Sequence, residues 1–306
     1  MEIAIDIGYG HTKIKTNETE FKFPTAVELA KTQMVETDTY NFEGKKFYVG
    51  EDATRNALLT RDYEFLYKYA PLLIVESLKM ANIDFSEDIT IKTGLSLYDL
   101  EKAAIFDKDA ANRRDEFSKR ISKFYVNDQE YKFNIKLFAQ GQGVWQDYCL
   151  DNGIIEDGYD VVVDIGYRTN DVIVFKNGKT NRAESSADDK GINQITTELQ
   201  TIINKRFDVV LTEQEVAAIL KNKYITISGA KKDLTNLIFE VVEGYIESFF
   251  NLLKAKHGNI LKIAQRVIIS GGGAYIIQEY AQTLPGNVVF SQAPLEYANV
   301  RGYYNA

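Results

Sequence analysis

The sequence predicts an α/β protein of two related domains, and three observations lead to that prediction. The tetrapeptide Asp-Ile-Gly-Tyr occurs twice, as Asp6–Tyr9 and Asp164–Tyr167, and apolar runs typical of β-strands flank each copy. Strand patterns and helix patterns alternate along the chain, which is typical of mixed sheets flanked by helices. The length of 306 residues is enough for about two domains.

Each repeat has the pattern of a strand, a glycine turn and a returning strand. Glycine lets the backbone approach a ligand and point successive N–H groups at it, while the aspartate adds a carboxylate. Backbone N–H groups suit phosphate oxygens, and carboxylates suit a hydrated Mg²⁺ ion. A recurring hairpin turn is the alternative, because aspartate and glycine are ordinary turn residues. Two copies in the same strand context favour two domains that grip one nucleotide phosphate tail.

The first half is rich in strand patterns and contains one strong helix pattern. Apolar residues at helical spacing predict a buried helix over 64–81, and the charged stretch 107–120 predicts a solvent-facing helix or loop. Tight turns at Glu43-Gly44 and Asn127-Asp128 predict hairpins, the second between residues 124–126 and 133–138. The other strand patterns cover residues 23–27 and 89–95.

The second half begins near Ile155, and its hairpin continues across Asn177-Gly178 into residues 179–184. The longest helix pattern has an apolar stripe at three- and four-residue spacing, which indicates a core-facing helix. The helix patterns cover residues 191–206, 212–221, 230–257 and 274–283, and a strand pattern covers residues 265–270.

Composition argues against several classes of protein and site. The net charge of −8 argues against a general nucleic-acid or anionic-membrane surface, so we expect no direct nucleic-acid contact. No apolar run reaches the ~20 residues of a membrane span, and the N-terminus lacks a signal-peptide pattern. The single cysteine, Cys149, excludes an internal disulfide, and with two histidines it is too little for a usual zinc site. These features favour a cytoplasmic protein.

Three further motifs are weak signals when each is taken alone. Gly271-Gly272-Gly273 follows a strand and opens a helix, where a nucleotide can lie against backbone, although a tight turn is the simpler explanation. Gln140-Gly141-Gln142-Gly143 precedes a helix pattern, so its amides would either orient a water molecule or cap the helix. Residues 298–303 include small side chains and predict a helix that packs closely on another helix.

Taken in order, these five motifs resemble the phosphate 1, connect 1, phosphate 2, adenosine and connect 2 motifs of the actin, sugar-kinase and heat-shock-chaperone ATPase superfamily. The short chain, Phe23-Pro24-Thr25 and the hairpin before Glu51-Asp52-Ala53 look most like bacterial, plasmid and archaeal actin-like proteins of the ParM/StbA type. The resemblance implies an actin-like ATPase fold, in which two related domains with mixed β-sheets flanked by helices surround a nucleotide cleft. Domain I would comprise residues 1–154 with the C-terminal helix 295–306, and domain II residues 155–294.

The resemblance also implies residue roles, with ATP or ADP and Mg²⁺ as cofactors. Asp6 and Asp164 would hold Mg²⁺ through water, and Gln140 or Gln142 would position the hydrolytic water. The first hairpin would wrap the β-phosphate with Gly8, Tyr9, Gly10, His11, Thr12 and Lys13. The second would contribute Gly166, Thr169 and Asp171. The adenosine would lie beside Gly271, Gly272 and Gly273, with Gly191 and Asn193 on the ribose side.

Two positions depart from the pattern that the resemblance implies. Some ParM-type proteins have a glutamate near the connect 1 turn, and a glutamine cannot act as a general base at neutral pH. Catalysis would then depend on orientation and electrostatics. Arg168 replaces an expected small residue, and it would either contact phosphate or point to solvent.

The function implied is a cytoplasmic ATPase that polymerises into nucleotide-dependent filaments. A head-to-tail contact between copies of the chain generates a helical filament because it does not close. Such filaments would serve plasmid or DNA segregation through a DNA-binding adaptor protein. The alternatives are a monomeric small-molecule kinase of the same fold and a non-hydrolysing ATP-binding assembly scaffold.

Overall fold

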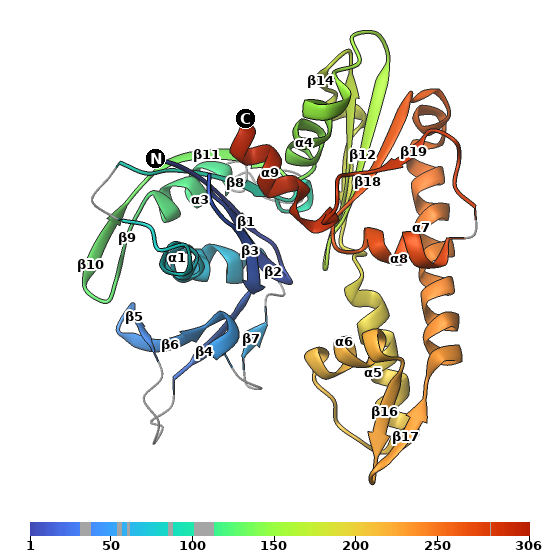
Figure 1. The fold of residues 1–306 in the computed structure, drawn as a ribbon, viewed down its shortest axis with the longest axis horizontal. Coiled ribbons are helices and arrows are strands. Elements are labelled where there is room, and N and C mark those ends of the chain that lie inside the picture. The colour runs from blue at the N-terminus through green and yellow to red at the C-terminus, as the bar shows by residue number, and fades with distance from the viewer. Residues whose placement is uncertain (31–37, 54–56, 60–61, 85–87, 101–112, 282) are drawn as a thin grey trace.

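The structure is a computed structural model in which two α/β halves meet at a pair of helices (Figure 1). It describes residues 1–30, 38–53, 57–59, 62–84, 88–100, 113–281 and 283–306. The first half contains strands β1 to β11 with helices α1 and α3, and the second contains β12 to β19 with α5 to α8. Helices α4 (Gln142–Asn152) and α9 (Ala298–Asn305) lie where the halves meet.

The two halves are built on sheets with the same strand order. The first sheet runs β3 (Glu20–Pro24), β2 (His11–Lys15), β1 (Glu2–Ile7), β8 (Thr90–Leu95) and β11 (Asn134–Ala139). The second runs β14 (Lys179–Thr180), β13 (Asn170–Lys176), β12 (Tyr159–Ile165), β18 (Arg266–Ser270) and β19 (Val288–Phe290). In both, the first three strands are antiparallel and the others are parallel. The repeated tetrapeptides therefore occupy equivalent places.

The strand registers align the two hairpins residue by residue. In the first, Asp6 lies opposite Lys13, and in the second Asp164 lies opposite Asp171. The two hairpins thus have the same backbone register, but the residue opposite the aspartate is a lysine in the first and an aspartate in the second. A further short strand, β15 (Ser186–Asp188), pairs with the outer side of β13.

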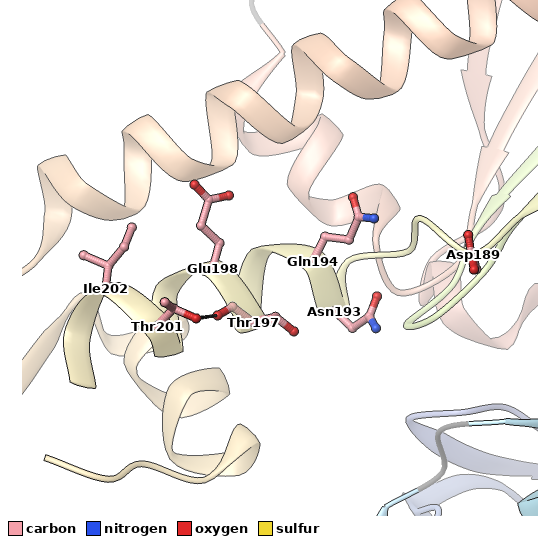
Figure 2. Close-up of a pocket in the computed structure, with 7 residues that line it drawn as sticks. All are labelled: Asp189, Asn193, Gln194, Thr197, Glu198, Thr201 and Ile202. Carbon is pink, nitrogen blue, oxygen red and sulfur yellow. Dashed lines mark hydrogen bonds between the residues drawn. The ribbon is translucent and has the colours of Figure 1, made fainter. Parts of the chain in front are cut away.

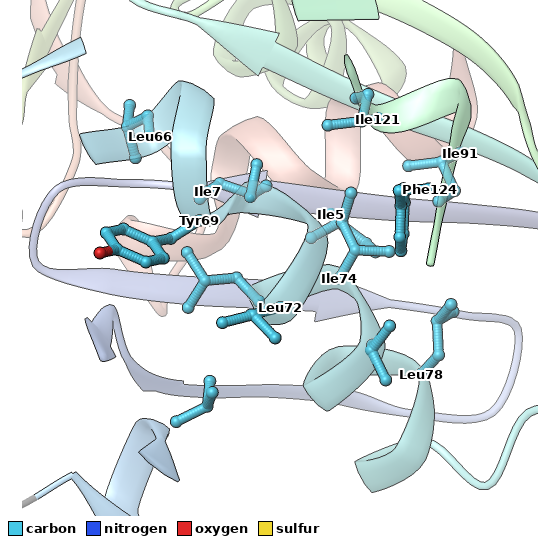
Figure 3. Packing of buried hydrophobic residues seen from close by; sticks show 14 of the residues in the cluster. Ile5, Ile7, Leu66, Tyr69, Leu72, Ile74, Leu78, Ile91, Ile121 and Phe124 are labelled. Atoms are coloured by element: carbon cyan, nitrogen blue, oxygen red, sulfur yellow. The ribbon is translucent and has the colours of Figure 1, made fainter. Parts of the chain in front are cut away.

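Each sheet is covered on both faces. Helices α1 (Tyr63–Met80) and α3 (Arg113–Ser122) cover the outer face of the first sheet, where Ile5 and Ile7 of β1 pack beside Leu72 (Figure 3). The outer face of the second sheet is covered by α5 (Asn193–Phe207), α7 (Thr235–Ile263) and α8 (Ala274–Tyr280). The inner faces pack against α4 and α9. The boundary between residues 154 and 155 stays a prediction.

Helices α4 and α9 approach each other through glycine, as predicted for residues 298–303. A Cβ atom on Gly302 would lie 1.8 Å from the carbonyl oxygen of Gly143, and one on Gly143 would lie 2.4 Å from that of Asn299. No larger residue fits at either position unless the helices separate. This contact brings the start of α4 and the start of α9 to the centre of the molecule.

Several predicted elements are confirmed with shifts of a few residues. The helix predicted over 64–81 is α1, that over 191–206 is α5, and that over 274–283 is the shorter α8. Helix α6 (Glu213–Asn222) begins with a capping box between Thr212 and Glu215. The predicted turns at 43–44, 127–128 and 177–178 all have positive φ angles, which closes tight hairpins.

The prediction that residues 124–126 pair with 133–138 is wrong. Strand β9 (Lys123–Val126) pairs with β10 (Gln129–Lys132), because the two-residue turn at Asn127-Asp128 imposes the register. Only Tyr131 is buried in β10, and the other residues of this strand are polar and exposed. The sequence therefore lacks the apolar pattern by which a strand is predicted. Strand β11 instead pairs in parallel with β8.

The extended piece predicted over 23–27 divides between two sheets. Strand β3 ends at Pro24, and β4 (Ala26–Leu29) joins a small sheet of order β5-β6-β4-β7. Proline has no N–H to continue the ladder, while the N–H of Thr25 bonds to the carbonyl of Gly10. The other strands of this sheet are β5 (Tyr40–Phe42), β6 (Lys45–Val49) and β7 (Leu58–Leu59).

The helix predicted over 230–257 begins later and ends later, as α7. Residues 230–233 form strand β17 (Ala230–Asp233), which pairs with β16 (Tyr224–Ile227) across Ser228-Gly229. Both turn residues have positive φ angles, a hairpin signal that the sequence interpretation overlooked. Of the charged stretch 107–120, residues 107–112 lie outside the described residues, and α3 begins at Arg113. Among the described helices, none is long and apolar enough to cross a membrane.

Candidate functional site

The site centres on Asp6 and Asp164, which stand near the ends of the equivalent strands β1 and β12. Their side chains are 1% and 6% exposed. Burial, and then the negative charge of Asp6, raise the pKa of Asp164 to about 6. The fold therefore holds two carboxylates close enough to repel each other in a place with little solvent.

Different neighbours stabilise the two carboxylates. Lys13 of β2 pairs with Asp6, with 2.8 Å between Nζ and Oδ2, and the amide nitrogen of Gln140 lies 3.2 Å from the other oxygen, Oδ1. Asn299 of α9 donates to Asp164 Oδ2 over 2.6 Å, so a neutral amide supports this carboxylate. The charge of Asp164 is consequently less well balanced than that of Asp6.

Asp171 adds a third buried carboxylate, 1% exposed. Burial and then the charge of Asp164 raise its pKa well above the usual range. Ser96 Oγ donates to it over 2.9 Å, and the N–H of Leu97 donates over 2.7 Å. Asp171 thus joins the second hairpin to the segment that follows β8 in the first half, where residues 97–100 are helical. Its predicted contact with nucleotide stays a prediction.

The turn of the first hairpin packs against the turn of the second. A Cβ atom on Gly10 would lie 3.2 Å from the side chain of Tyr167. The hydroxyl of Tyr9 donates to Asp99 over 2.6 Å, so this ring points into the first half. The hydroxyls of Thr12 and Thr25 lie 2.9 Å apart, and Thr25 donates to the carbonyl of Gly8 over 2.7 Å.

His11 begins β2 beside this turn and is exposed. Gly8 itself is crowded, because a Cβ atom there would lie 3.0 Å from the carbonyl oxygen of His11 and 3.2 Å from Lys13 Nζ. Lys13 therefore lies over the glycine turn while it pairs with Asp6. These positions bring together five of the six predicted residues of the first hairpin near one turn, with the Tyr9 side chain turned elsewhere.

The start of α5 supports the second turn. The N–H groups of Gly191, Ile192 and Asn193 bond to carbonyl oxygens of residues 166–168, and the N–H of Gly166 bonds to the carbonyl of Thr169. A Cβ atom on Gly191 would lie 2.5 Å from the turn backbone, so glycine permits this approach. These N–H groups of α5 hold the turn and are engaged with it.

A groove extends along α5 from this turn (Figure 2). Its volume is about 420 Å³. Asn193 lies in this groove between Gln194 and Asp189, and the side-chain oxygen of Asn193 is buried without a hydrogen-bond partner among the described residues. Its other lining residues are Asp189, Gln194, Thr197, Glu198, Thr201 and Ile202.

The triple-glycine turn lies directly against Asp164. Gly271 has a φ of +88°, and a Cβ atom there would lie 2.5 Å from Asp164 Oδ1. The N–H of Gly273 bonds to the carbonyl of Ile165 over 2.9 Å, which fixes the glycine turn on the second hairpin. Gly272 has open space where a side chain would project. The backbone at Gly272 is therefore open to the flat face of a ligand.

The two candidate glutamines have different surroundings. Gln140 contacts Asp6, as described above. The side-chain oxygen of Gln142 accepts from the N–H of Ala139 over 2.9 Å, and its nitrogen donates to Thr180 over 3.3 Å. Gln142 therefore supports the entry to α4, which leaves Gln140 as the amide beside the carboxylates.

Sequence interpretation missed Asn299, Tyr303 and Ser96. Asn299 bonds at once to Asp164 and to the N–H of Gly141, so it fastens the start of α4 to the second hairpin. The pKa of Tyr303 is raised by burial and by all three carboxylates, which places its hydroxyl near the group. The asparagine lay within the recognised motif at residues 298–303, so a signal was present for it.

The side chains around the carboxylates suit a hydrated divalent cation. Asp6, Asp164 and Asp171 are buried, and Lys13 pairs with Asp6, whereas the hydrogen bonds to Asp164 and Asp171 come from neutral groups. Negative charge in such surroundings is costly unless a cation balances it. Within the described residues no group of three or more His, Cys, Asp or Glu side chains could ligate a metal, so water would have to complete the coordination.

Comparison with known proteins agrees with this architecture. The model of the actin-like protein N-terminal domain matches residues 4–143, and that of the C-terminal domain of archaeal MreB-like actin homologues matches residues 162–282. The chain belongs to the actin-like ATPase superfamily. An archaeal actin homologue of Thermoplasma acidophilum is 26% identical to this actin-like protein, over 99% of this chain and 98% of its own length.

Solved structures establish the actin-like fold. An archaeal actin homologue superposes with a TM-score of 0.83 at 21% identity, and its complex with ADP with a TM-score of 0.78 at 20% identity; each covers 99% of this chain and 98% of the other. A 15-stranded ParM filament from Clostridium botulinum gives a TM-score of 0.80 at 20% identity, over 99% of this chain and 97% of the other. The superfamily and the fold expected from the five motifs are confirmed.

Replacing Asp164 with asparagine should stabilise the nucleotide-free protein at neutral pH. Because the pKa of Asp164 rises on folding from 3.8 to about 6, its ionisation opposes folding above that range. In EDTA at pH 7.5 we expect the free energy of unfolding of Asp164→Asn to exceed that of the parent by on the order of 1–3 kcal/mol in urea titrations. The gain should shrink as pH falls from 6 towards 4.

Asp160→Asn is the matched control for that measurement. Asp160 is also buried in β12, but it pairs with Arg266 over 2.7 Å and accepts from the Trp145 indole. Breaking this pair leaves a half-buried charge, so this variant should lose stability at pH 7.5. Equal losses in both variants would contradict the account of Asp164.

Proposed function

We propose that this protein binds Mg²⁺–ATP between its two halves, hydrolyses it, and uses the nucleotide cycle to control head-to-tail assembly. The observation that carries the proposal is the pair of buried carboxylates, Asp6 and Asp164, at equivalent strand ends beside two touching glycine turns. This arrangement suits a phosphate chain with its cation. Membership of the actin-like ATPase superfamily and the likeness to an ADP-bound archaeal actin homologue support it.

The residues of this chain would divide the work as follows. The backbone of the two turns, at Gly8–Gly10 and Gly166–Thr169, would hold phosphate oxygens, and Lys13 would balance their charge. Asp6 and Asp164 would hold the waters of a Mg²⁺ ion, which supplies electrostatic stabilisation of the phosphate chain. Gly272 offers open backbone for the adenosine, and the unpartnered oxygen of Asn193 suits a ribose hydroxyl.

Gln140 would orient the attacking water. Because its amide nitrogen donates to Asp6, the amide oxygen is directed away from that carboxylate and is available to accept a hydrogen bond from water. A neutral amide contributes orientation but takes up no proton. We therefore expect slow hydrolysis that depends on alignment, which suits a filament timer better than a metabolic enzyme.

Assembly is proposed from the relatives together with the two-half architecture. The likeness to a ParM filament supports a head-to-tail polymer, and plasmid or DNA segregation is the process we infer for it. The net charge of −8 favours an adaptor protein as the DNA-binding partner. The alternatives are a small-molecule kinase and a non-hydrolysing scaffold. The assembly experiment below distinguishes both from a filament-forming ATPase.

Gln140→Ala should slow turnover without loss of substrate binding. If Gln140 orients water, kcat for ATP should fall at least about tenfold while KM changes less than about threefold. Gln142→Ala is the matched control, since Gln142 bonds to Ala139 and Thr180, and its kcat should stay within about threefold of the parent. A Gln142→Ala variant as slow as Gln140→Ala would assign both residues to the entry of α4.

Nucleotide should drive assembly. Light scattering in Mg²⁺–ATP should rise above a threshold protein concentration, fall as ATP is consumed, and stay high with a slowly hydrolysed analogue. Sedimentation of the same samples measures the polymer directly. A monomer at tens of micromolar protein, with turnover that sugars or acids stimulate, would favour the kinase; assembly without turnover would favour the scaffold.

A further inference from the structure

Arg168 belongs to the second turn, but its side chain contacts the first half. Its guanidinium carbon lies 4.8 Å from the ring centre of Tyr9 and 5.6 Å from that of Tyr98. Both distances fall within the range of a cation–π interaction. The side chain therefore lies against the first half, between two of its aromatic rings.

Both rings are anchored at their hydroxyl ends. Tyr9 donates to Asp99, which is 3% exposed in the first half, over 2.6 Å. Tyr98 donates to Asp189 of the second half over 2.8 Å. Tyr98 thus contacts the second half at two places: Arg168 lies over its ring, and Asp189 accepts a hydrogen bond from its hydroxyl. Rings fixed in this way present a rigid slot to the guanidinium.

The segment that carries Tyr98 is attached to the second hairpin at a further place. It follows β8, and its residues 97–100 are helical. Ser96 and the N–H of Leu97 bond to Asp171, as described above, and the Leu97 side chain is buried with Val162 and Ile173 of the second sheet. The 96–99 segment is therefore the part of the first half that the 164–171 hairpin holds. Arg168 stands at the tip of that hairpin.

The two rings are the main contacts of the guanidinium. Its Nη1 atom is buried and has no hydrogen-bond partner among the described residues. A buried donor without an acceptor is costly, so the contact with the rings has to offset that cost. The backbone of Arg168, in contrast, is fixed, because its carbonyl accepts from Gly191 of α5. Any shift of the turn would therefore be passed to the side chain.

We propose that Arg168 is a latch that couples occupancy of the second turn by a phosphate chain to closure of the first half onto the second. Phosphate held by the turn backbone would fix the turn, and would thereby stabilise both the guanidinium between Tyr9 and Tyr98 and the hydrogen bonds of the 96–99 segment to Asp171. Arg168 is thus a positioning residue that acts through Tyr98. The proposal rests on the proposed function, because it requires nucleotide to bind at the turn.

Hydrogen exchange of the 96–99 segment, measured beside nucleotide affinity, tests this proposal. The N–H of Leu97 bonds to Asp171 and that of Asp99 to the carbonyl of Ser96, so both amides report on this segment. The probe is Mg²⁺–ATP, and calorimetry gives its Kd. Arg168→Met keeps an unbranched apolar stem without the guanidinium and its charge, and Tyr98→Leu removes the ring. Arg168→Lys and Tyr98→Phe are the conservative variants, since one keeps the charge and the other keeps the ring.

In the parent, Mg²⁺–ATP should slow exchange at these amides at least about tenfold, a coupling typical of linked sites. Arg168→Met and Tyr98→Leu should each lose most of that protection while their Kd for ATP rises less than about tenfold. Arg168→Lys and Tyr98→Phe should retain most of it. Because two different residues test one latch, failure of either variant to fold leaves the other as the test.

Three results would overturn the latch. Full protection of the Leu97 and Asp99 amides by Mg²⁺–ATP in Arg168→Met or Tyr98→Leu would show that the 96–99 segment closes without the latch. A loss of ATP affinity well beyond tenfold in Arg168→Met, with none in Tyr98→Leu, would make Arg168 a direct phosphate ligand. Absence of ATP binding by the parent would overturn the latch together with the proposed function, and this result is recognised before any variant is compared.

Discussion

The burial of like charges at the meeting point of the two halves is the constraint on which the rest of the structure depends. Asp6, Asp164 and Asp171 lie within the fold, and the pKa values of Asp164 and Asp171 are raised by burial and by a neighbouring carboxylate. Such a cluster destabilises the protein that contains it unless a ligand gains from it. Asn299, Ser96 and the backbone of Leu97 supply hydrogen bonds to it, and Gly271 lets backbone approach it. These contacts limit the cost without removing the charge.

The internal repeat gives the two hairpins one backbone and two different tasks. Opposite Asp6 the first hairpin has Lys13, which balances the carboxylate. Opposite Asp164 the second has Asp171, which accepts hydrogen bonds from the segment after β8. The first hairpin thus balances its own carboxylate, and the second also contacts the opposite half. The close approach of Gly143 and Gly302 places α4 and α9 beside both hairpins. Gln140 therefore reaches Asp6, and Asn299 reaches Asp164.

Local patterns in the sequence predicted the elements and the central pair, because they depend on neighbours in the chain. The repeated tetrapeptide predicted two related hairpins, and helical spacing predicted α1 and α5. The patterns missed what depends on distant partners: Ser96 acquires its role from Asp171, and Asn299 from Asp164. They also missed β10 and β17, whose polar and charged residues carry little apolar periodicity. Arg168 departed from the motif, and only its contacts with two tyrosines give that departure a physical meaning.

Proton release on binding Mg²⁺–ATP tests most directly the claim that the buried carboxylates form a cation-assisted nucleotide site. Near pH 6 Asp164 is about half protonated in the free protein, and a cation beside it should drive the proton off. Calorimetric titrations in buffers of different ionisation enthalpy should therefore show the parent releasing up to about half a proton more than Asp164→Asn at pH 6, with the excess vanishing at pH 8. Equal proton release by the two proteins at pH 6, with ATP binding unaffected by removal of Mg²⁺, would contradict the account.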